Sequence, residues 1–300
     1  MRWIGIDGGG TSLRVVIVDD DLYEIASATG EGVNPNTVGL DTAQNRIRQL
    51  VRNVLKQGGL HSVDGVAIGI AGASNEHSAD WLRQTLQPVL PEAAIVPSSD
   101  MEIALVGARG RLDGILLLAG TGSVAFGISP DGQQQRIGGW GYLLGDEGSG
   151  YWIGMQALQS LTRSFDGLII LSSQLPQVLM THLDLQRPSD LIRWLYQKAT
   201  PGDVASLAPL VMDLAAQEDK LARDIISKAA EHLTSMVQTL LTNLKLDRES
   251  IVFAGSLLTD NTLLQTMVCQ RLDLRSTPVA CHTPVVGAAL LAKLRGKTQC

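Results

Sequence analysis

Short apolar runs separated by turn residues mark the beginning of the chain. Residues 3–6 form one run, Asp7-Gly8-Gly9-Gly10-Thr11 forms a turn, and the β-branched run at 13–18 ends at three consecutive aspartates. Residues 24–28 continue the pattern. Apolar runs of this length between glycine and aspartate clusters predict three successive strands.

A helical period follows these strands. Asp41 is placed to cap a helix, and Gly58-Gly59 is placed to end it. Between them, the apolar residues have the spacing of one helix face: Ile47, Leu50, Val51, Val54 and Leu55. Two further apolar runs, at 63–70 and 93–96, predict two more strands.

The opening pattern returns in the second part of the chain. Residues 114–118 form an apolar run, Gly120-Thr121-Gly122-Ser123 forms a glycine turn, and 124–128 and 133–137 predict two more strands. A unit that occurs twice indicates two similar domains that face each other.

The remainder is rich in helical patterns. The longest runs from about Asp219 to Leu244, and residues 251–254 predict a strand before Gly255-Ser256. Thr283-Pro284 opens a last helix at about 284–297, with a cap residue and a proline at its first position.

The length of the chain agrees with the repeat, because 300 residues exceed what a single core ordinarily supports. We expect an N-terminal domain at 1–106 and a C-terminal domain at 107–300. The last helix is free to pack back on the first of them.

Composition and charge narrow the classes of partner. Hydrophobic residues make up 45% and charged residues 18% of the chain, which is ordinary for a globular protein. A net charge of −6 argues against a nucleic-acid or anionic-membrane partner. No apolar run reaches the ~18 residues that span a bilayer, and the N-terminus lacks the features of a signal peptide. The three cysteines, Cys269, Cys281 and Cys300, form no metal-ligand pattern, so we expect free thiols and a cytoplasmic protein.

The two glycine turns carry the first candidate chemistry. Consecutive glycines at a strand end let the backbone approach a ligand, and free amides in such a turn can cradle phosphate oxygens. Asp7, at the strand end, is able to hold Mg²⁺ directly or through water. A tight hairpin without a ligand is the alternative for each turn. Two such turns at matching places of a repeated unit favour a polyphosphate, although neither fits GxxxxGK[ST] or GxGxxG.

Polar residues near these turns offer further chemistry. Asp146 and Glu147 lie among dense glycines before a helical pattern, where they suit either helix capping or hydrogen bonds to sugar hydroxyls. Trp140 suits either a sugar face or the core. Asp100 follows a strand and is either an N-cap or a general base. Asn34 suits either a sugar or its own turn. The five histidines form no metal or triad pattern.

Three blocks of the chain are similar to a known family. They are residues 4–11, residues 119–123 and GGWGYLLGDEGSGYWIG at 138–154. In these blocks the sequence resembles the N-acetylglucosamine kinase group of the BadF/BadG/BcrA/BcrD ATPase family. The resemblance implies an α/β fold of two duplicated ribonuclease H-like (actin-like ATPase) domains with a nucleotide and sugar cleft between them. It also implies ATP-dependent phosphorylation of an amino sugar, above all N-acetylglucosamine to its 6-phosphate.

The resemblance also implies a role for each matching residue. Asp7 would orient Mg²⁺, and Asp100 would be the catalytic base. ATP phosphates would meet residues of both turns: Gly9, Gly10, Thr11, Gly120, Thr121 and Gly122. Gly255 and Ser256 would lie near the adenosine. The sugar would be held by Asn34, Gly139, Trp140 and Asp146. The first domain would supply sugar and phosphate contacts, and the second, with a helical insertion, would bind the nucleotide.

Two departures from the family pattern leave the sugar open. The loop Ile70-Ala71-Gly72-Ala73 lacks an expected hydroxyl, and Val124 replaces a polar residue. Glucosamine or N-acetylmuramic acid is therefore an alternative acceptor. A BadF-type activator ATPase with an iron–sulfur cluster and a non-catalytic sugar sensor are alternatives of another class. A homodimer is left open.

Overall fold

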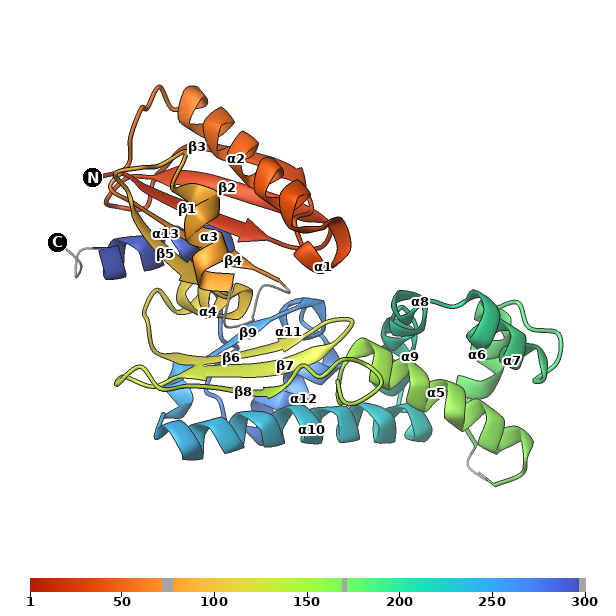
Figure 1. Ribbon diagram of the computed structural model, residues 1–300. Coiled ribbons are helices and arrows are strands. Elements are labelled where there is room, and N and C mark those ends of the chain that lie inside the picture. Colours follow the sequence, from red (N-terminus) through yellow and green to blue (C-terminus); the bar gives the residue numbers. More distant parts are fainter. Residues whose placement is uncertain (72–77, 169–171, 297–300) are drawn as a thin grey trace. The chain divides into compact units, whose positions relative to one another are not determined.

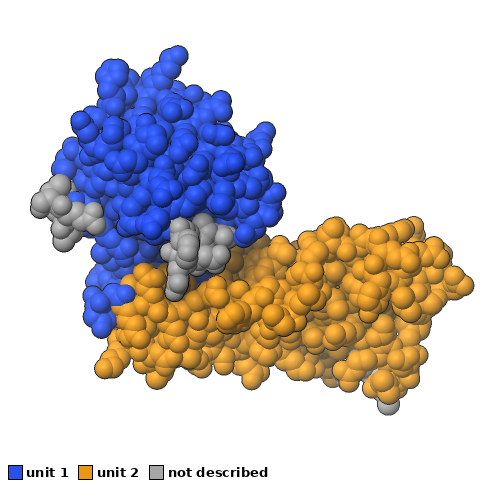
Figure 2. All heavy atoms as spheres, in the orientation of Figure 1, with its two compact units in different colours: residues 1–116, 130–132, 280–300 blue, residues 117–129, 133–279 orange. Residues whose placement is uncertain are grey.

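The computed structural model describes residues 1–71, 78–168 and 172–296. The chain divides into two compact units, coloured separately in Figure 2. Unit 1 contains residues 1–116, 130–132 and 280–300, and unit 2 contains residues 117–129 and 133–279. The expected boundary after residue 106 would fall inside a helix that ends at Arg109.

Unit 1 is built on a five-stranded sheet with the order β3-β2-β1-β4-β5. Its strands lie at the places that the apolar runs predict: β1 (Trp3–Gly8), β2 (Ser12–Val18), β3 (Glu24–Glu31), β4 (Gly65–Ile70) and β5 (Ala94–Ser98). The first three pair antiparallel, whereas β4 pairs parallel with both β1 and β5. The carboxyl ends of β1, β4 and β5 therefore meet at one edge of the sheet.

Alternate side chains of a strand point to opposite faces of the sheet, and in unit 1 both faces are covered by helices. Ile4 and Ile6 pack with the apolar stripe of α2 (Leu40–Gln57), whereas Trp3 packs with α4 (Asp100–Arg109) and α13 (Pro284–Gly296). Figure 1 shows α2 and α13 on opposite faces of the sheet. Two shorter helices, α1 (Pro35–Val38) and α3 (Ser78–Leu86), complete the described part of unit 1.

The predicted cap of α2 is wrong. The helix begins at Leu40 with Gly39 as its N-cap, and Asp41 lies in the first turn. A carboxylate in the first turn still stabilises a helix through the helix dipole.

Unit 2 repeats most of the first sheet. Its four strands are β6 (Gly114–Ala119), β7 (Ser123–Ile128), β8 (Gln134–Gly138) and β9 (Ile251–Ala254), in the order β8-β7-β6-β9. This order corresponds to β3-β2-β1-β4 of unit 1, which agrees with the predicted duplication. The mixed α/β fold with two related sheets is confirmed.

Helices make up most of the rest of unit 2. The longest is α10 (Lys220–Leu244), which is capped by Asp219 and contacts β7 and β8. The others are α5 (Gly150–Phe165), α6 (Leu175–His182), α7 (Asp190–Arg193), the π-helix η1 (Trp194–Lys198), α8 (Pro201–Ala205), α9 (Ala208–Ala216), the 3₁₀-helix η2 (Arg248–Ser250), α11 (Ser256–Thr259) and α12 (Leu263–Arg271). Within the described ranges, no helix has both the length and the apolar character to cross a bilayer.

Candidate active site

The first glycine turn connects β1 to β2 in unit 1. The Gly9 N–H donates to the Ser12 carbonyl at 2.8 Å, and the Val33 N–H donates to the Gly9 carbonyl at 2.9 Å. A β-carbon on Gly8 would lie 2.6 Å from Cγ2 of Val33, so this position needs glycine. Around Gly10 the same test meets open space. The outer side of the turn is therefore accessible to a ligand, while its inner side is closed by the protein.

Gly32, which follows β3, packs against this turn and was not predicted from the sequence. A β-carbon on Gly32 would lie 2.1 Å from the Gly10 carbonyl oxygen and 2.9 Å from the Thr11 nitrogen. Gly32 therefore lets the segment after β3 lie directly against the turn. In the sequence Gly32 stands two positions before the candidate residue Asn34, and this position alone does not indicate the contact with the turn.

Asp7 is the candidate metal residue, and it lies near the end of β1. Its backbone is opposite Arg14 on β2 and Gly69 on β4. Burial raises the pKa of Asp7, the positive charge of Arg14 lowers it, and the negative charge of Asp100 raises it. Asp7 and Asp100 thus influence each other electrostatically, as expected for two acids that serve one site.

The start of α4, which carries Asp100, lies against β4 because of a glycine. A β-carbon on Gly69 would lie 2.7 Å from the Ser99 carbonyl oxygen, so glycine lets the start of α4 lie directly on β4. Since Gly69 is the β4 partner of Asp7, the start of α4 lies beside the end of β1.

The interpretation of Asp100 as a helix cap is wrong. Ser99 is the N-cap of α4, and its Oγ accepts a hydrogen bond from the Glu102 N–H at 3.1 Å. Asp100 is the first residue of the helix, where the dipole stabilises a negative charge. The general-base interpretation stays a prediction.

Asn34 does stabilise its own turn. It is the N-cap of α1, and its Oδ1 accepts a hydrogen bond from the Asn36 N–H at 3.0 Å. An amide oxygen has a second lone pair and its nitrogen has two donors, so this contact leaves room for a sugar. The predicted sugar contact of Asn34 is untested. Of the neighbouring loop that lacks a hydroxyl, Gly72 and Ala73 lie outside the described residues.

The second glycine turn, in unit 2, is anchored to a helix start. The Gly120 N–H donates to the Gly122 carbonyl at 2.9 Å, which closes the turn. The first two N–H groups of α5, on Gly150 and Tyr151, donate to the Gly120 and Thr121 carbonyls at 2.8 and 3.2 Å. The turn thus lies at the N-terminus of α5, where the dipole favours an anion.

Asp146 lies directly against this second turn. A β-carbon on Gly122 would lie 2.8 Å from Oδ2 of Asp146, whose side chain is only 8% exposed. Burial raises the pKa of Asp146, a hydrogen bond from the Ser123 backbone lowers it, and the charge of Glu147 raises it. Asp146 also has a left-handed backbone, with φ of 63°. A strained, buried acid beside a phosphate-type turn is typical of a functional position.

The capping interpretation of Asp146 and Glu147 is wrong. The N-cap of α5 is Ser149, whose Oγ accepts a hydrogen bond from the Trp152 N–H at 3.1 Å. The backbone carbonyl of Glu147 instead accepts a hydrogen bond from the Ser123 hydroxyl at 2.9 Å. This bond joins the glycine-rich segment before α5 to the turn before β7.

Gly139 and Trp140 belong to the same glycine-rich segment. The Gly139 N–H donates to the Ser123 carbonyl at 3.1 Å, and φ of Gly139 is 68°. A β-carbon there would lie 3.0 Å from Cγ2 of Val124, so the departure at Val124 adjoins a predicted sugar residue. Trp140 is 66% exposed, so its interpretation as a core residue is wrong, and the Arg136 guanidinium lies 5.1 Å from its ring centroid.

Gly255 and Ser256 follow β9, and Gly255 packs against the end of β6, the strand that precedes the second turn. A β-carbon on Gly255 would lie 2.2 Å from the Ala119 carbonyl oxygen, so glycine joins the ends of β9 and β6. Ser256 begins α11 and lines a pocket of about 440 Å³. Apolar and polar residues share this lining, among them Met212, Asp213, Leu257, Asp260 and Asn261.

Two groups of predicted residues are thus assembled, one in each unit. In unit 1, Asp7, Asp100 and the first turn lie together, and in unit 2, Asp146, Gly139 and the second turn do. Among the described residues no group of three or more His, Cys, Asp or Glu side chains could hold a metal ion. Asp7 still fits Mg²⁺, which typically uses one or two carboxylates together with substrate phosphates and water.

Comparison with known proteins finds sugar kinases that match most of the chain. The N-acetyl-D-glucosamine kinase of Dictyostelium discoideum is 31% identical, with 97% of each chain covered. The N-acetylmuramic acid/N-acetylglucosamine kinase of Clostridium acetobutylicum is 29% identical, with 83% of this chain and 82% of that protein covered. A solved structure of a candidate N-acetylglucosamine kinase from Chromobacterium violaceum has a TM-score of 0.71 and 27% identity, with 97% of this chain and 98% of that chain covered.

The architecture is that of the actin-like ATPases. Residues 4–292, nearly the whole chain, match one family of these proteins. The chain belongs to the BadF/BadG/BcrA/BcrD ATPase family.

Proposed function

We propose that this protein is an ATP-dependent amino-sugar kinase that forms N-acetylglucosamine 6-phosphate. The observation that carries the proposal is the position of two acids at the carboxyl edge of the unit 1 sheet, with Asp7 near the end of β1 and Asp100 at the start of α4. Functional groups of α/β sheets gather at this edge. The similarity to the Dictyostelium discoideum kinase over 97% of the chain supports the same activity.

Asp100 is the proposed general base. It takes the proton of the sugar 6-hydroxyl as that oxygen attacks the γ-phosphorus of ATP, and ADP leaves on the opposite side. It is the first residue of α4, and it is not needed as the helix cap, because Ser99 has that role. Asp7 is the proposed Mg²⁺ residue, and the bound ion would supply charge neutralisation on the phosphates.

The nucleotide is assigned to both glycine turns. Gly9, Gly10 and Thr11 in unit 1, and Gly120, Thr121 and Gly122 in unit 2, are the proposed phosphate contacts. The start of α5 adds the positive end of a helix dipole to the second turn. Gly255, Ser256 and the adjoining pocket of about 440 Å³ are the proposed adenosine site, because a mixed apolar and polar lining suits a nucleoside.

The sugar is assigned to Asn34, Gly139, Trp140 and Asp146. The exposed ring of Trp140 offers a flat apolar surface, and Asn34 and Asp146 offer amide and carboxylate partners for hydroxyls. Val124 beside Gly139 keeps glucosamine and N-acetylmuramic acid as alternative acceptors. A cytoplasmic location and a homodimer stay predictions.

The test is a panel of acceptors in an ADP-release assay with ATP and Mg²⁺. The panel contains N-acetylglucosamine, glucosamine, N-acetylmuramic acid and glucose. The highest kcat/KM is expected for N-acetylglucosamine. Equal or better turnover of glucose would contradict an amino-sugar kinase. ATP hydrolysis that no sugar stimulates would favour an activator ATPase, and sugar binding without turnover would favour a sensor.

A further inference from the structure

A buried carboxylate that the proposed mechanism does not use lies two residues from Asp100. Glu102 is 4% exposed, and both of its carboxylate oxygens have partners. Oε2 accepts a hydrogen bond from the Ser98 hydroxyl, and Oε1 accepts one from the Arg295 guanidinium, each at 2.6 Å. A buried carboxylate needs such partners, because burying an unpaired charge costs several kcal/mol.

These contacts hold the backbone on both sides of Asp100. Ser98 precedes Asp100 and bonds to the Glu102 carboxylate, while the Ser99 Oγ accepts a hydrogen bond from the Glu102 N–H. The strand end and the first turn of α4 are thus joined across Asp100. The backbone that carries Asp100 is therefore fixed on both sides of this residue.

Arg295 brings in a distant part of the chain, 193 residues from Glu102. It lies in the last turn of α13, a helix that packs backbone to backbone with α4. A β-carbon on Gly287 would lie 2.2 Å from the Ile103 carbonyl oxygen, and one on Gly107 would lie 2.6 Å from the Thr283 carbonyl oxygen. The beginning of α13 is therefore fixed at the end of α4, and Arg295 reaches the start of α4.

We infer that Glu102 and Arg295 are positioning residues, which hold Asp100 in the orientation for proton transfer. This inference rests on the proposed role of Asp100. In this inference neither Glu102 nor Arg295 touches a reacting atom. Both residues affect turnover by holding residues 98–102 in place, because their contact joins this segment to α13.

The first experiment replaces Arg295 by methionine, which keeps an unbranched apolar stem but removes the charge and the donors of the guanidinium. We expect kcat to fall at least about tenfold, because small misplacements of a reacting group are costly, and the sugar Kd to change less than about twofold. Arg295→Lys, which keeps the charge, should restore part of kcat. Unchanged kcat in a folded Arg295→Met variant would overturn the inference.

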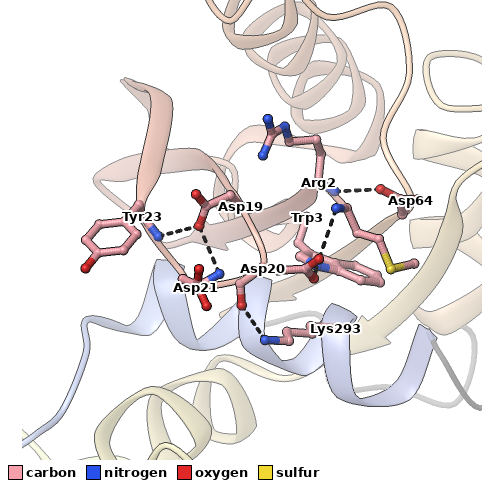
Figure 3. A network of polar contacts seen from close by, with 9 residues as sticks. Arg2, Trp3, Asp19, Asp20, Asp21, Tyr23, Asp64 and Lys293 are labelled. Atoms are coloured by element: carbon pink, nitrogen blue, oxygen red, sulfur yellow. Dashed lines mark hydrogen bonds and ion pairs between the residues drawn. The ribbon is translucent and has the colours of Figure 1, made fainter.

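Lys293 provides a matched control on the same helix. Its ammonium donates to the Asp20 backbone carbonyl, in the network around Asp19, Asp20 and Trp3 that Figure 3 shows. Lys293→Met removes an anchor of α13 that does not reach α4. It should lower the melting temperature and leave kcat near that of the unmodified protein. An equal fall of kcat in this control would reduce Arg295 to a general anchor of α13 and overturn the inference.

A double variant separates this inference from the proposed function. If Arg295 acts through Asp100, Arg295→Met should add less than about twofold to the loss caused by Asp100→Asn. If the losses of the two single variants multiply in the double variant, the inference about Arg295 is overturned, while the proposed role of Asp100 is unaffected. Near-normal turnover of Asp100→Asn itself would overturn the role of Asp100. Glu102→Gln, which keeps the volume and the acceptor for Ser98, repeats the test if Arg295→Met fails to fold.

Discussion

The carboxylate of Asp146 occupies the space where a side chain on Gly122 would begin, since a β-carbon there would lie 2.8 Å from Oδ2. The second glycine turn and the acidic residue of the segment before α5 are therefore in direct contact. A change on either side of this contact alters the other.

Gly122→Ala should therefore lower both stability and ATP affinity. Forcing a methyl group against buried Asp146 costs about 1–3 kcal/mol in the free energy of unfolding. Urea unfolding measures this cost in stability. The KM for ATP shows whether the altered turn still binds the nucleotide. Gly120→Ala is the control, because its β-carbon meets nothing within 4 Å. It should keep stability within about 0.5 kcal/mol, so equal destabilisation of both variants would contradict the contact.

Asp100→Asn should lower kcat by about 10²–10⁴-fold, because asparagine cannot take a proton. The melting temperature should stay close to that of the unmodified protein, since Ser99 caps α4. Ser99→Ala is the converse change and should cost about 1 kcal/mol of stability. Sugar binding by calorimetry and single-turnover kinetics check the first variant. A kcat within threefold or so of the unmodified value would remove Asp100 from the base role.

Asp7→Asn should abolish most turnover yet stabilise the fold at neutral pH. Burial, together with the charge of Asp100, raises the pKa of Asp7 above its ordinary value of 3.8. Ionised Asp7 therefore destabilises the folded state, and this cost appears as the pH rises through the raised pKa. Asparagine avoids it, so the gain in stability should be full above that pKa and vanish below pH 3.8 or so.

Asp203 offers a control of opposite sign for this pH dependence. Hydrogen bonds from Thr200 lower the pKa of Asp203, so its ionised form stabilises the folded state. Asp203→Asn should reduce stability at neutral pH, and the difference should disappear as the pH falls through the lowered pKa. Chemical denaturation across pH measures both variants. A loss of stability for Asp7→Asn at neutral pH would contradict the burial argument.

Trp140→Ala should weaken sugar binding with little effect on stability. The ring is 66% exposed, so removing it takes away little buried surface, whereas Trp3 is 1% exposed and its change to alanine should cost about 3–5 kcal/mol. The KM for N-acetylglucosamine should rise for Trp140→Ala while its melting temperature holds. An unchanged KM would mean that Trp140 does not contact the sugar.

Strands and glycine turns could be predicted because their signals are local. The apolar run at 13–18 and the turn at Gly120 depend on residues within a few positions of each other. Helix caps were harder, since Ser99 next to Asp100 and Ser149 three residues after Asp146 each offer two candidates of similar capping strength. The extended backbone at the two serines decides between them.

Contacts between distant segments could not be predicted from a single sequence. The need for glycine at position 32 arises from Gly10, and the partner of Glu102 is Arg295. Nothing in the spacing of these residues indicates that they meet. The position of Asp100 at the same sheet edge as Asp7 depends in the same way on Gly69, because a side chain there would push the start of α4 away from β4.

The place of α13 has a consequence for biosynthesis. This helix covers one face of the unit 1 sheet and contacts Gly5 through the Val285 carbonyl, yet it is synthesised only after residues 133–279 of unit 2. The apolar residues that it covers, Trp3, Val16 and Ala67 among them, precede unit 2 in the chain. This face of unit 1 therefore stays uncovered until unit 2 has been synthesised, so unit 1 cannot complete its core before unit 2 is made.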